Sequence, residues 1–276
     1  MMKVNLKTKL LVLVTFPIIV IASVGIFFIS GKLSEQGEQG LKDKSTAILS
    51  RLEAVRTFVA TQQTLEKTIA EMQQLYPHGN VPNEERERLL KQVPIISSMK
   101  VGADGAQNEN YKFKVAALHP RNGANLANEL EAQFIEQFKV TRQESIVHVN
   151  QETNELWVAR PVYLSNSQGC LRCHGNPQAS PWGNGKDIIG IPMENWNDGD
   201  LHGIFVIKSD LEPVQSSVAG AIRGIGVWGV VIVALAIIVG VYYVQRIINV
   251  INQIRNVSFK VSEGDLRHRV QINSDD

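Results

Sequence analysis

The chain has 276 residues, a length that accommodates one or two domains. Its formal net charge is +1, so the composition excludes a strongly basic nucleic-acid-binding surface and a strongly acidic tail. Charged residues make up only 20% of the chain, a low share that two long uncharged apolar runs explain.

The first apolar run occupies residues 10–30 and follows three lysines, Lys3, Lys7 and Lys9. A helix of this length crosses a hydrocarbon core about 30 Å thick. A cleaved signal peptide is the alternative, but its apolar region usually has only about 7–15 residues. We therefore expect a cytoplasmic N-terminus at residues 1–9 and a transmembrane helix at residues 10–30.

The second uncharged run, Ile225 to Val244, predicts another transmembrane helix at residues 223–245. Arg246 and Arg255 follow it, so positive residues flank both runs on the same side. The positive-inside rule then places both ends of the chain in the cytoplasm. We expect residues 31–222 to lie outside the membrane as one domain.

A long helix is predicted from Gly31 to Tyr76. Apolar residues recur along it at steps of three and four, the coiled-coil period, at Leu41, Ile48, Leu52, Val55 and Val59. The pattern continues less regularly through Leu65, Ile69, Met72 and Leu75. A helix with one apolar stripe is not stable alone, so we expect a partner chain or the rest of its own domain to cover it. A parallel homodimer is the expected assembly.

The segments after this helix predict a small mixed domain. The apolar patterns favour helices at residues 84–91 and 127–138, and strands at residues 111–115, 146–149, 156–163 and 203–207. A long helix followed by a small sheet and another helix belongs to the α+β class.

Both cysteines of the chain lie in the stretch Cys170-Leu171-Arg172-Cys173-His174. This C-x-x-C-H pattern is typical of covalent attachment of a c-type haem. Two thiols three residues apart reach the two vinyl groups of one porphyrin edge, and the adjacent His174 then ligates the iron. The sequence therefore predicts one covalent haem c held by Cys170, Cys173 and His174. Its attachment requires an oxidising compartment, which agrees with the predicted topology.

Three other interpretations of the cysteine pair explain less. A disulfide would not require His174. A zinc site usually needs four protein ligands, or three and a water, and the chain has no second cysteine pair to complete one. A thioredoxin-like pair would open a helix in a βαβ unit, whereas Gly175-Asn176-Pro177 follows here and indicates a loop.

Residues 40–210 resemble the c-type haem-binding, PAS-like sensor domains of bacterial chemoreceptors and sensor kinases. The matching stretches are Pro120-Arg121-Asn122, Ala159-Arg160-Pro161-Val162, Cys170 to Gly175, Met193-Glu194-Asn195-Trp196 and His202-Gly203. The resemblance implies a haem against a small antiparallel sheet, in a periplasmic domain of a multi-pass protein of the bacterial inner membrane. It also places Arg121 and Arg160 where they could bind the haem propionates, because arginine pairs well with carboxylates.

Residues 246–276 resemble the first helix and connector of a HAMP relay module, in which a Gly-Asp-Leu turn follows an amphipathic helix. Gly264-Asp265-Leu266 matches that turn, whereas Asn249 stands in place of the usual proline. The resemblance implies a receptor that passes a signal to cytoplasmic proteins through an output domain after residue 276.

The sixth ligand of the iron decides the function, since a strong ligand makes a redox centre and an open site binds gas. Met72, on the apolar face of the long helix, is the first candidate, and His202 is the second. The other external candidates are His78, His119, His148, Met99 and Met193. In the c-type haem sensor domains that residues 40–210 resemble, the sixth ligand varies.

We expect a transmembrane receptor that senses redox state or a small gas (NO, CO or O2), and no enzymatic activity. The alternative is a membrane-anchored c-type cytochrome that transfers electrons to a redox partner. The HAMP-like segment and the long helix favour the receptor, because an electron carrier needs neither.

Overall fold

The computed structural model describes residues 6–263. Its contacts define one compact unit at Gln36–Pro213 and a second unit built from the segments before and after it. The predicted external domain at residues 31–222 overlaps the first of these units.

Two long helices form the second unit, and α1 also extends into the first. Helix α1 (Leu6–Thr61) continues through Pro17, and α7 (Glu212–Ser262) contains the second apolar run. Each has an 18-residue window, of mean hydropathy 2.8 and 2.7 respectively, that is apolar enough to cross a membrane by length and composition. Two helices long and apolar enough to cross a membrane are therefore confirmed, while their insertion into a membrane and their orientation stay predictions. The predicted Gly264-Asp265-Leu266 turn lies outside the described residues.

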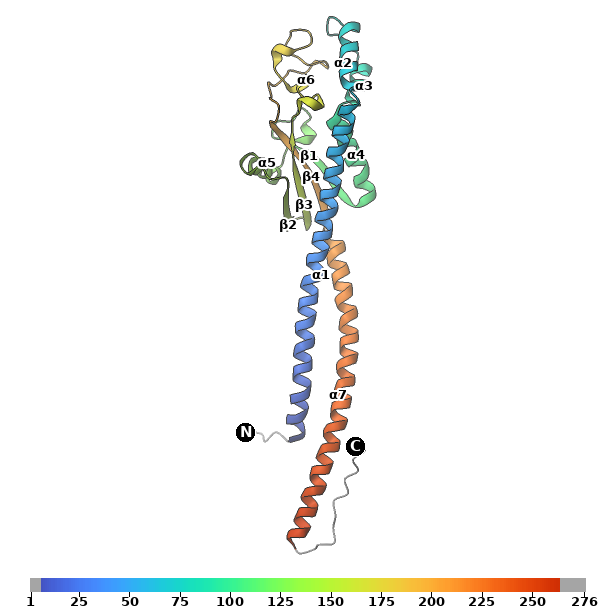
Figure 1. The fold of residues 1–276 in the computed structure, drawn as a ribbon, viewed down its shortest axis with the longest axis vertical. Helices are drawn as coiled ribbons and strands as arrows, with labels where there is room; N and C mark the ends of the chain where they lie inside the picture. The colour runs from blue at the N-terminus through green and yellow to red at the C-terminus, as the bar shows by residue number, and fades with distance from the viewer. Residues whose placement is uncertain (1–5, 264–276) are drawn as a thin grey trace. The chain divides into compact units, whose positions relative to one another are not determined.

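The compact unit at Gln36–Pro213 is built on a four-stranded antiparallel sheet (Figure 1). Its order is β1-β4-β3-β2, with bounds Tyr111–Ala116, Leu201–Asp210, Glu155–Tyr163 and Ile146–Asn150. All three pairings are antiparallel. Each strand overlaps a predicted one, so the α+β class and the antiparallel sheet are confirmed, while the PAS-like identity stays a prediction.

Helices cover both faces of this sheet (Figure 1). Successive residues of a strand point to opposite faces, so Ile204 and Val206 of β4 pack toward α5 (Glu129–Thr141), whose Phe134 and Phe138 share their cluster. Phe205 and Ile207 pack instead with Ile48, Leu49 and Leu52 of α1. The central strand β4 is therefore buried on both sides, which explains its continuous apolar sequence.

The apolar stripe of α1 is thus covered in part by its own domain. Ile48 and Leu52 are 8% and 2% exposed in this single chain. Helix α4 (Pro94–Glu109) also packs on α1, where Ser98 Oγ donates a 2.7 Å hydrogen bond to the Leu52 carbonyl oxygen. This helix was not predicted from the sequence, although Pro94 is a residue typical of a first helical turn.

The prediction of one helix from Gly31 to Tyr76 is wrong at a single point. Helix α1 ends at Thr61 and α2 spans Thr64–Leu75, with Gln63 between them in the left-handed region at φ 54°. The segment between the two helices contains neither glycine nor proline, so no ordinary breaker signal marks it. Helix α3 (Asn83–Leu90) then packs on α2 and confirms the predicted helix at residues 84–91.

We predict that Leu52→Ala lowers the free energy of unfolding by about 2–5 kcal/mol, because it leaves a cavity between α1 and the sheet. Phe58→Ala on the same helix is the matched control. Phe58 is 66% exposed, so its replacement should change stability by no more than about 0.5 kcal/mol. Urea denaturation followed by tryptophan fluorescence measures both, and equal effects would contradict the packing described.

Candidate functional site

The C-x-x-C-H stretch forms a single helical turn, α6 (Leu171–His174). The carbonyl oxygen of Cys170 accepts hydrogen bonds from the backbone nitrogens of Cys173 (3.2 Å) and His174 (3.0 Å). Glycines flank the turn: Gly169 has φ 76°, and a Cβ atom at Gly175 would lie 2.5 Å from the Leu171 carbonyl oxygen. The turn therefore places both thiols and the imidazole on one short rigid segment.

His174 is oriented by a carboxylate. Its Nδ1 lies 3.0 Å from Oε2 of Glu194, so Nδ1 carries the hydrogen and Nε2 keeps a lone pair for a metal. Burial lowers the pKa of His174, and the charge of Arg121 lowers it further against the opposing effect of Glu194. The imidazole is therefore neutral near neutral pH, which is the form that ligates iron.

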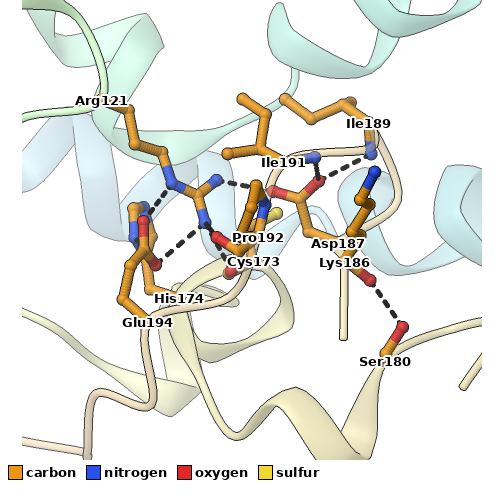
Figure 2. A network of polar contacts seen from close by, with 10 residues as sticks. All are labelled: Arg121, Cys173, His174, Ser180, Lys186, Asp187, Ile189, Ile191, Pro192 and Glu194. Atoms are coloured by element: carbon orange, nitrogen blue, oxygen red, sulfur yellow. Dashed lines mark hydrogen bonds and ion pairs between the residues drawn. The ribbon is translucent and has the colours of Figure 1, made fainter. Parts of the chain in front are cut away.

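Arg121 is the centre of the polar network around this turn (Figure 2). Its Nη2 donates to the carbonyl oxygen of Cys173 at 2.7 Å and to Glu194 Oε2 at 2.9 Å, and its Nε also pairs with Glu194. Its Nη1 donates to Asp187 Oδ2 at 2.6 Å. One guanidinium group thus connects the turn to the loop that follows it.

Asp187 has no exposed side-chain surface. Its other oxygen, Oδ1, accepts from the backbone nitrogens of Ile189 (3.0 Å) and Ile191 (2.9 Å). The buried charge is therefore compensated by Arg121 and by two backbone hydrogen bonds, as a buried carboxylate requires.

The two arginines predicted to bind propionates occupy different places. The guanidinium of Arg121 contacts the cysteine turn but is largely engaged by protein oxygens. Arg160 lies on β3 and donates to Ser50 Oγ of α1 at 2.9 Å. The structure thus brings Arg121, but not Arg160, into contact with the turn, and propionate binding by either stays a prediction.

Met72 and Cys173 belong to one apolar cluster. Met72 is 0% exposed among Leu65, Ile69, Val81, Leu89 and Ile188, and Cys173 packs against this group. Burial raises the pKa of the Cys173 thiol to about 12, with a smaller contribution from Asp187. Met72, the predicted first candidate for the sixth ligand, therefore lies in the same apolar surroundings as Cys173.

His202, the second candidate, lies directly against His174. The two ring centroids are 4.9 Å apart at an interplanar angle of 54°, a separation typical of rings in contact. Burial, followed by the effect of His174, lowers the pKa of His202 to about 4, and its Nδ1 is buried without a hydrogen-bond partner. In this arrangement no porphyrin fits between the two imidazoles.

A cleft of about 370 Å³ opens beside the cysteine turn, within the range of about 300–1,000 Å³ typical of ligand sites. Helix α2, the turn and the loop after it line the cleft with Ile69, Gln73, Asn166, Leu171, Arg172, Gly175, Asn176, Ala179, Pro181, Ile188, Trp196, Asn197 and Asp198. Two adjacent thiols, a histidine with a free Nε2 and a neighbouring cleft fit a covalently attached haem.

Glu194 and Asp187 had no role in the predictions from sequence. Glu194 is 20 residues from His174 in a loop without regular structure, so no periodic pattern links the two. Its place in the family-like stretch Met193-Glu194-Asn195-Trp196 was the one signal that singled it out.

We predict that Arg121→Ala lowers the free energy of unfolding by about 3–5 kcal/mol, because it leaves the buried Asp187 carboxylate without its cation. Arg51→Ala, which removes an exposed arginine on α1, should cost no more than about 0.5 kcal/mol. Thermal or urea unfolding of both variants measures the difference. A small effect of Arg121→Ala would show that the ion pair is not a structural requirement.

Parts of this chain are similar to known proteins. The Tll0287-like family model matches residues 34–210. A curated relative, the sensor protein kinase WalK of Staphylococcus saprophyticus, is 23% identical over 165 residues, which cover 55% of this chain and 26% of that protein. The chain thus spans about a quarter of the length of this relative.

Among solved structures, the crystal structure of the cyanobacterial heme-protein Tll0287 is similar at 16% identity and a TM-score of 0.44. The similarity covers 62% of this chain and 95% of that one. The family model covers well over half of the present sequence, including the sheet, the cysteine turn and the Arg121 network. The chain therefore belongs to the Tll0287-like family.

Proposed function

We propose that this chain is a transmembrane receptor whose external domain carries one covalent haem c and senses redox state or a small gas. The observation that carries the proposal is the His174 geometry. The cysteine turn fixes the imidazole beside two thiols, and Glu194 holds Nδ1 so that Nε2 is free. Membership of the Tll0287-like family and the likeness to the sensor kinase WalK support the same assignment.

Cys170 and Cys173 would form the two thioether bonds, and His174 would be the first axial ligand. When bound, the haem supplies an iron whose oxidation state or axial ligation changes with the signal. Met72 would supply the second iron ligand, and its burial in the cluster against which Cys173 packs supports this choice. His202 is less suitable in this arrangement, because its ring already contacts that of His174.

The cysteine turn and the short segment before it also contact the helices on both sides of the break at Gln62 and Gln63. Before the break, Glu53 of α1 accepts a 3.2 Å hydrogen bond from Gln168. After it, Glu66 of α2 pairs with Arg172, with contacts of 3.0 and 2.9 Å. A change at the turn would therefore act on both helices, and the break between them would serve as the two-state element that a relay requires.

The relay would then follow α1 and α7, the two membrane-competent helices, since β4 leads into α7 with only Leu211 between them. In the proposal, the external domain is periplasmic and the HAMP-like segment at residues 246–276 passes the signal to cytoplasmic signalling proteins. A homodimer in the inner membrane is part of the same proposal. It assigns a sensor rather than an enzyme.

Expression of the chain with the c-type haem maturation system tests the cofactor. We expect a covalent haem that remains with the denatured polypeptide and gives a haemochrome spectrum of the c type. Cys170→Ala with Cys173→Ala should abolish covalent attachment, because both thioether bonds are lost. A wild-type protein without covalent haem would overturn the proposal.

The same preparation separates the sensor classes. Uptake of CO or NO by the ferrous wild type would favour gas sensing. A six-coordinate spectrum that ignores both gases would favour redox sensing, or the alternative role of a membrane-anchored electron carrier. Signal output measured in a reconstituted receptor would then separate the last two.

Met72→Leu tests the second axial ligand, because leucine conserves volume but has no thioether sulphur. We expect wild-type ferrous protein to be six-coordinate and the variant to become five-coordinate and bind CO. Met99→Leu, a partly buried methionine packed in the α1–sheet cluster, is the matched control and should leave the spectrum unchanged. Identical spectra for Met72→Leu and wild type would exclude Met72 as the ligand.

A further inference from the structure

Glu194 is held against the cysteine turn by its side chain and by the backbone that follows it. Its Oε2 accepts a 2.9 Å hydrogen bond from Arg121 Nη2 and lies 3.0 Å from His174 Nδ1, while its Oε1 pairs with Arg121 Nε. The next two backbone nitrogens, of Asn195 and Trp196, donate to the carbonyl oxygens of Gly175 (3.0 Å) and His174 (2.9 Å). The carboxylate therefore has one well-determined position relative to the imidazole.

The pairing with Arg121 also fixes the orientation of the Glu194 carboxylate. A guanidinium that contacts a carboxylate through two nitrogens fixes the plane of that carboxylate. The same guanidinium is itself fixed by the buried Asp187 and by the carbonyl oxygen of Cys173. Glu194 thus cannot rotate away from His174 without breaking contacts that also hold the turn.

The charges of this group are unequal. Two carboxylates, Asp187 and Glu194, face one guanidinium, so the neutral imidazole of His174 lies beside a net negative group. Glu194 pairs with the Arg121 guanidinium through both of its oxygens, and this contact stabilises the charged carboxylate beside the imidazole. A carboxylate that accepts the hydrogen of a ligating histidine makes that histidine a stronger electron donor to its metal.

We infer that Glu194 is a positioning residue for the haem iron, which fixes the orientation of His174 and favours the ferric state by increasing the donor strength of its imidazole. The inference rests on the proposed haem function. Arg121 acts through Glu194, since it shares the carboxylate with His174 and so limits the charge that the imidazole receives.

Glu194→Gln in the haem-loaded full-length chain tests this inference. Glutamine keeps the shape of the side chain and an acceptor for His174, but it removes the charge. We expect the ferric-to-ferrous equilibrium to shift at least about tenfold toward the ferrous form, a rise of about 59 mV for one electron. The low-spin ferric EPR signal should change as well, because it reports the strength of the axial ligands.

Glu144→Gln is the matched control, since it makes the same charge change at an exposed position after α5. Its potential and EPR signal should equal those of the wild type. Thermal unfolding of both variants shows whether the fold is kept. Equal potentials for Glu194→Gln and Glu144→Gln would overturn the inference while leaving the haem proposal intact, whereas wild-type protein without covalent haem would overturn both.

If Glu194→Gln fails to fold or to load haem, Glu194→Asp tests the inference in its place. Aspartate keeps the charge but withdraws it by one methylene, so the hydrogen bond to His174 is lost or lengthened. We expect its potential to rise above that of the wild type, and an unchanged potential with an unchanged EPR signal would overturn the inference.

Discussion

The guanidinium of Arg121 is the interaction on which the arrangement of the site depends. It donates at once to the turn that contains both cysteines, to the buried Asp187 and to the Glu194 that orients His174. The Asp187 carboxylate has no exposed surface, and a charge buried in this way is stable only when an opposite charge compensates it. The loop at residues 186–194 has no regular secondary structure of its own, so this compensation, with its backbone hydrogen bonds, determines where it lies.

The sheet provides the rigid support for this group. Arg121 follows β1, whereas the cysteine turn follows β3 and the loop after it leads into β4, so three neighbouring strands deliver the parts of the site. Because β4 is buried on both faces, these strands are fixed relative to one another. The site itself lies in the connections, where a cofactor can be approached by side chains from several segments.

Helices α1 and α2 both contact the structure around the site. Helix α1 packs on the sheet through Leu49 and Leu52, and α2 covers the cysteine turn through the cluster around Met72. Gln63 lies in the left-handed region between a helix that packs in the sheet cluster and one that packs in the Met72 cluster. Gln168 and Arg172 contact the two helices on either side of this break.

The sequence alone determined the features that depend on neighbouring residues: the C-x-x-C-H turn, the two apolar runs, the alternating strands and the class of the fold. The tertiary structure decided which side of α1 is covered, where the helix bends, and that Glu194 and Arg121 meet at His174. Those contacts join residues 20 to 73 positions apart and form only when the fold brings their segments together, so no periodic signal in the chain marks them.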